Sequence, residues 1–174
     1  MLRRFVTVLL ALAALCTCAP HRIEARSTWE DRSPIVLYDS RMPPEYSESL
    51  CKAVDEWRKR GYKFRGCFRA LVSPLNTDAF GPDGMPLPGL IVVVMAKELP
   101  PGTVAVTMMG TDESGHMQSA LMVVQPGYYS ERLRALVFGH ELGHALGFEH
   151  VWIRGNIMYP ALDGAGFNDD GLRR

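Results

Sequence analysis

The sequence has no excess of charge of one sign. Its 174 residues include 19 Lys and Arg and 19 Asp and Glu, so the formal net charge is zero. A chain with this balance has no basic field to attract nucleic acid or an anionic membrane surface. We therefore expect no nucleic-acid partner.

Long apolar runs are missing outside the N-terminus. Arg3 and Arg4 precede an apolar run at residues 5–15, and small residues follow it up to Ala19. This order is typical of a secretory signal peptide, and the run is too short for a stable membrane span. We predict a signal peptide at residues 1–19 and a protein that is secreted or periplasmic.

A lipoprotein anchored at Cys16 or Cys18 is the alternative to a cleaved signal peptide. Leu15 and Thr17 precede these two cysteines, where a small Gly or Ala is usual. This makes lipid anchoring the less favoured of the two interpretations.

Internal repeats, low-complexity tracts and interdomain linkers are also absent from the sequence. We predict a polar, flexible lead-in at residues 20–33 and one domain at 34–174, which is long enough to form a core. Apolar runs and helical spacing predict an order of strand, helix, strands and helix, with strands at 34–39, 62–72, 90–95, 102–109 and 117–124 and helices beginning near Pro43 and Gly127. This order indicates a single α/β or α+β domain.

Cysteine is scarce: only Cys51 and Cys67 lie outside the predicted signal peptide. An even pair in an exported protein predicts a disulfide, and a helix that folds back on the following strand could bring the two residues together. Two buried free thiols are the alternative. Because neither cysteine has a CxxC spacing, we expect neither to be redox-active or to bind a metal.

Three of the five histidines lie in one short segment, His-Glu-Leu-Gly-His-Ala-Leu-Gly-Phe-Glu-His at 140–150. His140 and His144 are four residues apart, so they share one face of a helix and can share a metal ion. Gly147 can take the left-handed conformation that ends the helix, and the turn then returns His150 as a third imidazole. Glu141 follows the first of these histidines.

Three imidazoles with an open fourth position are typical of a catalytic zinc site, since structural sites are usually closed by four protein ligands. A chance match at five fixed positions would occur about once in 10⁵ chains of this length at average residue usage. The spacing therefore predicts one catalytic Zn²⁺ on His140, His144 and His150, with Glu141 as general base toward a metal-activated water.

The segment 140–150, extended by Gly-Asn-Ile-Met-Tyr-Pro at 155–160, resembles the signature of the metzincin zinc endopeptidases. In that family a methionine turn follows the zinc motif, and Met158 fits the turn as support beneath the metal. The run from 157 to 160 is most similar to the matrixin branch. The resemblance implies a zincin-like α+β fold: a five-stranded twisted mixed sheet with about three helices, the zinc helix packed against the sheet.

The resemblance also implies a substrate that lies extended beside the edge strand at 102–109. Residues 159–165, which begin with Tyr159 and Pro160, would form a wall of the pocket for the side chain that follows the scissile bond. Matrixin latency depends on a propeptide cysteine, and the predicted lead-in contains none, so this control is not expected. Asn168 resembles the beginning of the last family helix, which would be truncated here. We predict no calcium site.

The predicted function is that of an exported, monomeric zinc endopeptidase acting on a peptide or protein substrate. Two alternatives remain open from the residues alone. One is a zinc-binding interaction module without turnover, although Glu141 argues against it. The other is a zinc hydrolase that acts on a non-peptide amide, because the zinc motif does not restrict what occupies the cleft.

Overall fold

A computed structural model of the chain describes residues 23–24, 28–29, 33–72, 78–127, 129–161, 165–166 and 172–173. The predicted signal peptide at 1–19 lies outside the described residues.

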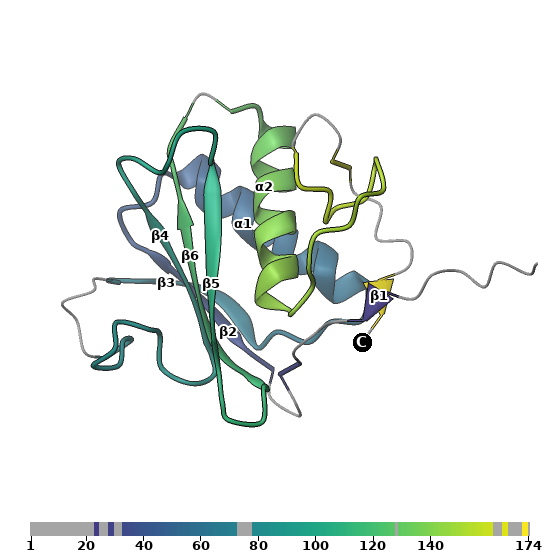
Figure 1. Ribbon diagram of the computed structural model, residues 1–174. Helices are drawn as coiled ribbons and strands as arrows, with labels where there is room; N and C mark the ends of the chain where they lie inside the picture. Colours follow the sequence, from purple (N-terminus) through teal and green to yellow (C-terminus); the bar gives the residue numbers. More distant parts are fainter. Residues whose placement is uncertain are drawn as a thin grey trace, which may run out of the picture.

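The described part is built on a mixed five-stranded sheet of order β3-β2-β4-β6-β5 (Figure 1). Its strands are β2 (Ile35–Asp39), β3 (Gly66–Ala70), β4 (Leu90–Met95), β5 (Ala105–Thr111) and β6 (Met117–Val124). The pairs β2–β3, β2–β4 and β4–β6 are parallel, whereas β5 pairs antiparallel with β6. This confirms an α+β fold with a five-stranded mixed sheet, and β5 is an edge strand.

Two helices pack on the same face of this sheet (Figure 1). Helix α1 (Pro44–Lys59) begins with a proline at its first position, where a missing N–H costs no helical hydrogen bond. Helix α2 (Glu131–Ala145) begins after Ser130, whose side chain accepts a hydrogen bond from Leu133 N. The cap explains why this helix begins four residues later than the predicted Gly127.

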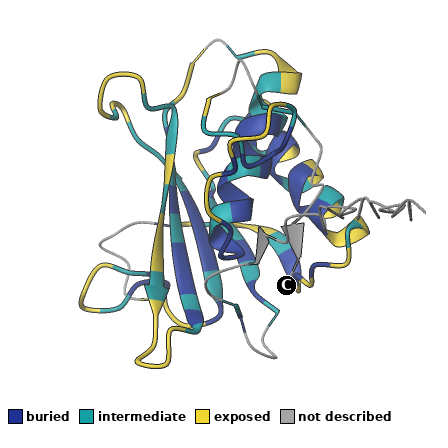
Figure 2. Ribbon diagram, turned by 45° about the vertical axis from the view of Figure 1, so that its right-hand side comes forward, coloured by how far each residue is buried: buried dark blue, intermediate teal, exposed yellow. Residues whose placement is uncertain are grey.

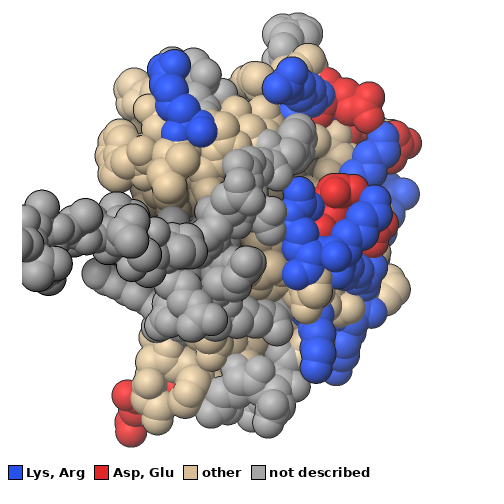
Figure 3. All heavy atoms as spheres, turned by 90° about the vertical axis from the view of Figure 1, so that its right-hand side faces the viewer, with Lys and Arg blue, Asp and Glu red and all other residues tan. Residues whose placement is uncertain are grey.

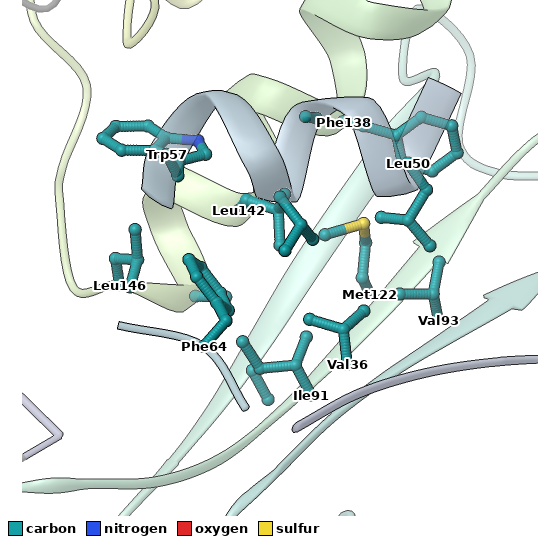
Figure 4. Packing of buried hydrophobic residues seen from close by; sticks show 14 of the residues in the cluster. Val36, Leu50, Trp57, Phe64, Ile91, Val93, Met122, Phe138, Leu142 and Leu146 are labelled. Carbon is teal, nitrogen blue, oxygen red and sulfur yellow. The ribbon is translucent and has the colours of Figure 1, made fainter. Parts of the chain in front are cut away.

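The main core lies between the helices and the sheet. Leu50 of α1 and Leu142 of α2 point toward Val36, Ile91 and Met122 of the sheet (Figure 4), and all five are fully buried. Burial of such a side chain stabilises the fold by about 1.5–3 kcal/mol. Figure 2 shows the buried residues of this core in dark blue, along the central strands and on the helix turns next to them.

Strand β4 is apolar on both faces because both are covered. Ile91 belongs to the main core, whereas Val92 packs on the other side with Val72 and Phe80 in a second apolar cluster. The bounds of β4 and β6 are the predicted ones.

Two strand predictions were wrong at their ends. Strand β3 is shorter than the predicted 62–72, because Tyr62 and Phe64 are buried in an irregular segment before it. Strand β5 lies two to three residues later than predicted, because Gly102 has a left-handed φ of 83° in the preceding turn.

The expectation of about three helices was also wrong for the described residues, which contain two. Leu172–Arg173 (β7), expected in a truncated last helix, is extended and pairs in parallel with Ile23–Glu24 (β1). Pairing gives these main-chain groups partners from a distant segment. The expected helix start at Asn168 lies outside the described residues.

The prediction of a flexible lead-in at 20–33 was wrong at Trp29, because this residue is buried in the main core. Its indole Nε1 donates to the carbonyl of Ala145 at 2.7 Å, at the end of α2. Beside it, Met117 N donates to Thr28 O at 2.9 Å. The packed part of the domain therefore includes residues before 34.

Charged side chains of both signs adjoin each other on the surface (Figure 3). On and near α1, Lys52 pairs with Glu131 at 2.6 Å and Lys59 with Glu56 at 2.7 Å. Exposed pairs of this kind stabilise little, about 0–1 kcal/mol each. Within the described residues, no helix combines the length and apolarity needed to cross a membrane.

Cys51 of α1 and Cys67 of β3 form a disulfide, with Cα atoms 5.8 Å apart and 16 residues of sequence separation. The bond ties the helix to the parallel edge of the sheet that lies opposite β5. This pairing is the one predicted from the sequence, and the alternative of two free thiols does not hold in this structure.

We expect the double variant Cys51→Ala/Cys67→Ala to lose about 3 kcal/mol of unfolding free energy, because an open chain of this loop length has more conformational freedom when unfolded. Urea unfolding of the oxidised protein and the variant measures the difference. The reduced wild-type protein is the control and should unfold near the variant. Free thiols at Cys51 and Cys67 in the denatured, unreduced wild type, located by alkylation and peptide mapping, would contradict the disulfide.

Candidate metal centre

The site is formed where α2 ends and the chain reverses. Gly147 has a φ of 94°, and its N–H donates to His144 O at 2.8 Å. Phe148 N then donates to Gly143 O at 3.0 Å, which completes the end of the helix. The left-handed glycine predicted at this position is present, and the turn carries His150 back toward the helix.

The three predicted histidines converge. Nε2 of His140 lies 3.1 Å from Nε2 of His144, and both lie 3.2 Å from Nε2 of His150. Four ligands at about 2.0–2.1 Å around a tetrahedral zinc ion are separated by about 3.3 Å. The three nitrogens therefore fit three corners of such a site. Among the described residues, this is the one cluster of three or more potential ligands that could hold a metal ion.

Hydrogen bonds on the far side of two rings determine their tautomer. His140 Nδ1 lies 2.8 Å from the carbonyl oxygen of Ile157, and His144 Nδ1 lies 2.7 Å from that of Phe148. A carbonyl can only accept, so each Nδ1 carries the proton and each neutral ring presents a bare Nε2. A carbonyl partner of this kind orients metal-binding histidines and raises their basicity as ligands.

The surroundings keep these two rings neutral. Burial is the largest cause that lowers the pKa of His140, to about 4, and the nearby His144 adds to it. Burial also lowers the pKa of His144. Two lone pairs facing each other at 3.1 Å repel, and a cation between them would turn this repulsion into attraction. The donor set therefore fits a zinc ion, which takes neutral imidazole nitrogen.

Glu141 is buried and is held by a neighbouring strand. Thr107 Oγ1 donates to Glu141 Oε2 at 2.6 Å, and it lies 3.2 Å from the Glu141 carbonyl oxygen. Burial raises the pKa of the Glu141 carboxyl, while the hydrogen bond from Thr107 opposes that rise. A carboxyl group in such surroundings is suited to exchange protons nearer neutral pH than a solvated one.

Met158 lies behind the histidines and is fully buried. Its N–H donates to Asn156 Oδ1 at 2.8 Å, and its carbonyl accepts from Val151 N at 2.9 Å, so the turn is closed on both sides. The sulfur of Met158 packs against Gly143, where a Cβ atom would overlap it. The position fits the predicted support role, and no ligand role is needed.

A cleft of about 1010 Å³ contains the three histidines and Glu141. Residues of the edge strand β5 line it, and so do the predicted cleft residues Tyr159 and Pro160 together with Ala161. Residues 162–164, also expected to line the cleft, lie outside the described residues. The predicted metal ligands, the predicted base and the predicted cleft residues thus share one open cavity, whereas Met158 is buried beneath it.

Three site residues were not found from the sequence: Thr107, Gly143 and Asn156. Each acts through a contact between segments far apart in the chain, or through a turn whose closure depends on packing. The strand predicted at 102–109 includes Thr107, but its sequence does not indicate which element Thr107 contacts. Gly143, the fourth residue of the segment 140–150, was the one sequence feature that indicated close packing against α2.

No protein-family model matches the chain, and no curated protein sequence matches it. Among solved structures, the fold is similar to a zinc-dependent peptidase from Methanocorpusculum labreanum (strain Z), with a TM-score of 0.40 and 14% sequence identity. The likeness covers 76% of this chain and 91% of that one.

The Gly143→Ala variant should lose roughly 1–3 kcal/mol of unfolding free energy and bind zinc more weakly, because the new Cβ displaces the buried sulfur of Met158. Calorimetry and zinc titration measure both effects. Gly139→Ala on the same helix is the control, since its Cβ meets only the flexible end of Ile157 at 3.0 Å. Equal behaviour of the two variants would contradict a special role of Gly143.

Zinc-free protein should lose roughly 2–3 kcal/mol of stability as the pH falls from about 6.5 to about 4. In this window the unfolded chain protonates its imidazole at position 140, while the folded one stays neutral, so acid favours unfolding. Urea unfolding after chelator treatment at several pH values measures this. The difference in slope from a His140→Gln variant isolates this residue, and identical slopes would refute the assignment.

Proposed function

We propose that this chain is an exported, zinc-dependent endopeptidase of the metzincin type, nearest to the matrixin branch. One observation carries the proposal: three imidazole nitrogens lie 3.1–3.2 Å apart, with two of the rings held by main-chain carbonyls in the tautomer that binds a metal. Structural zinc sites are usually closed by four protein ligands, so a set of three favours catalysis.

His140, His144 and His150 would hold the zinc ion. When bound, zinc supplies a Lewis acid and lowers the pKa of a coordinated water toward about 7. Because neutral imidazoles add no negative charge, they leave the positive charge of the ion undiminished. Their carbonyl partners keep the rings from rotating away.

Glu141 would act as general base and then as general acid. Its carboxylate takes a proton from the attacking water and gives it to the leaving amine nitrogen as the peptide bond breaks. Burial supports this role because it makes the carboxylate a stronger base than a solvated one. Among the described residues of the cleft, we assign this proton transfer to Glu141 alone.

The substrate would be a polypeptide in extended conformation. Strand β5 is an edge strand and lines the cleft, so the main-chain groups on its outer side are available to an added strand. Tyr159 and Pro160 would contact the side chain that follows the scissile bond. The disulfide between Cys51 and Cys67 supports export, since such bonds persist in oxidising compartments.

We expect Glu141→Gln to retain one zinc ion per chain and to lose at least about 10³-fold in kcat, because the amide cannot accept the proton from water. Metal analysis and cleavage of a quenched peptide library measure the two quantities. His144→Ala, as a matched variant, should lose both zinc and turnover.

The same assay separates the proposal from its alternatives. Zinc-loaded wild type that cleaves no peptide would refute peptidase activity and would favour a binding module or a different amide substrate. A Glu141→Gln variant as active as wild type would refute only the role of the base.

A further inference from the structure

Thr107 contacts the proposed general base from a different element of the fold. Its Oγ1 lies 2.6 Å from Glu141 Oε2 and 3.2 Å from the main-chain oxygen of the same residue. A hydroxyl has one proton to donate, and the shorter contact to the carboxylate takes it. Glu141 is 7% exposed, so few waters compete for this bond.

The contact with Thr107 involves one oxygen of the Glu141 carboxylate, Oε2, so any other partner would bind Oε1. The last torsion of a glutamate side chain is broad and nearly two-fold, so an unanchored carboxylate samples many orientations. A strong hydrogen bond to Oε2 restricts that torsion. The same bond does not involve Oε1.

We propose that Thr107 is a positioning residue: it holds Glu141 by Oε2 so that Oε1 is presented to the attacking water in one orientation. The inference rests on the proposed function, since it concerns the same site. It assigns a role to a strand residue outside the histidine motif.

The anchor comes from the sheet rather than from the helix that carries Glu141. Thr107 lies on β5 opposite Met122 of β6, so its backbone is held by antiparallel pairing. Its β-branched side chain has a restricted χ1, which fixes the hydroxyl further. The orientation of the carboxylate is therefore defined relative to β5, the cleft wall along which the extended polypeptide would bind.

The test compares two substitutions with the zinc-loaded wild type. Thr107→Val keeps the shape and the strand preference but removes the hydroxyl, and it should lower kcat at least about tenfold with KM changed less than about threefold. Zinc content should stay at one ion per chain. Thr107→Ser restores the hydroxyl and should recover most of the lost kcat.

A second measurement needs neither zinc nor activity. In a double-mutant cycle on chelator-treated protein, Thr107→Val and Glu141→Ala should have non-additive effects on the urea midpoint, because each removes one partner of the same contact. Thr111→Val on the same strand is the matched control and should be additive with Glu141→Ala.

Every result of the kinetic comparison and of the double-mutant cycle either supports or overturns the positioning role of Thr107. Coupling in the cycle, a loss confined to kcat and rescue by serine support the inference. Additivity, or a Thr107→Val variant with wild-type kcat, overturns it. If that variant does not fold, Thr107→Ala takes its place in both measurements. Wild type that cleaves no peptide removes the proposed function and this role with it, whereas active wild type with an equally active Thr107→Val removes this role alone.

Discussion

The hydrogen bonds from two imidazole Nδ1 atoms to the carbonyls of Ile157 and Phe148 are the constraint on which the site depends. They set the tautomer of His140 and His144, and they tie the end of α2 to the two segments that follow it. The bare Nε2 atoms converge only because the rings cannot turn away. Burial adds to this, since it keeps both rings neutral without a metal.

The core extends directly to the candidate metal centre. Trp57 of α1 donates through its indole Nε1 to Gly139 O at 2.9 Å, and its ring stacks on Phe148, whose carbonyl holds His144. At Gly143 of α2, the Trp57 ring and the sulfur of Met158 both pack against the space that a larger side chain would need. A well-packed interior is stiff and transmits small shifts, so the position of the ligands depends on residues that never approach a metal.

Some of the fold could be predicted because the relevant signal is local. The all-apolar run at β4 and the apolar segment at β6 have the predicted bounds, and the spacing of Leu50, Val54 and Trp57 marks the buried face of α1. The shifted ends of β3 and β5 and the burial of Trp29 were missed. In these cases contacts with distant segments, rather than local preference, decide where a strand or the packed domain begins.

The sequence by itself determined the donor set: two histidines one helical turn apart, a glycine that can reverse the chain and a third histidine within its reach. Helical geometry and the freedom of glycine at positive φ are properties of a short segment. Only the tertiary structure decided which protons the rings carry, which carboxylate oxygen is anchored and what supports the site from behind. Those depend on the carbonyl of Ile157, the hydroxyl of Thr107 and the sulfur of Met158, and packing alone brings them to α2.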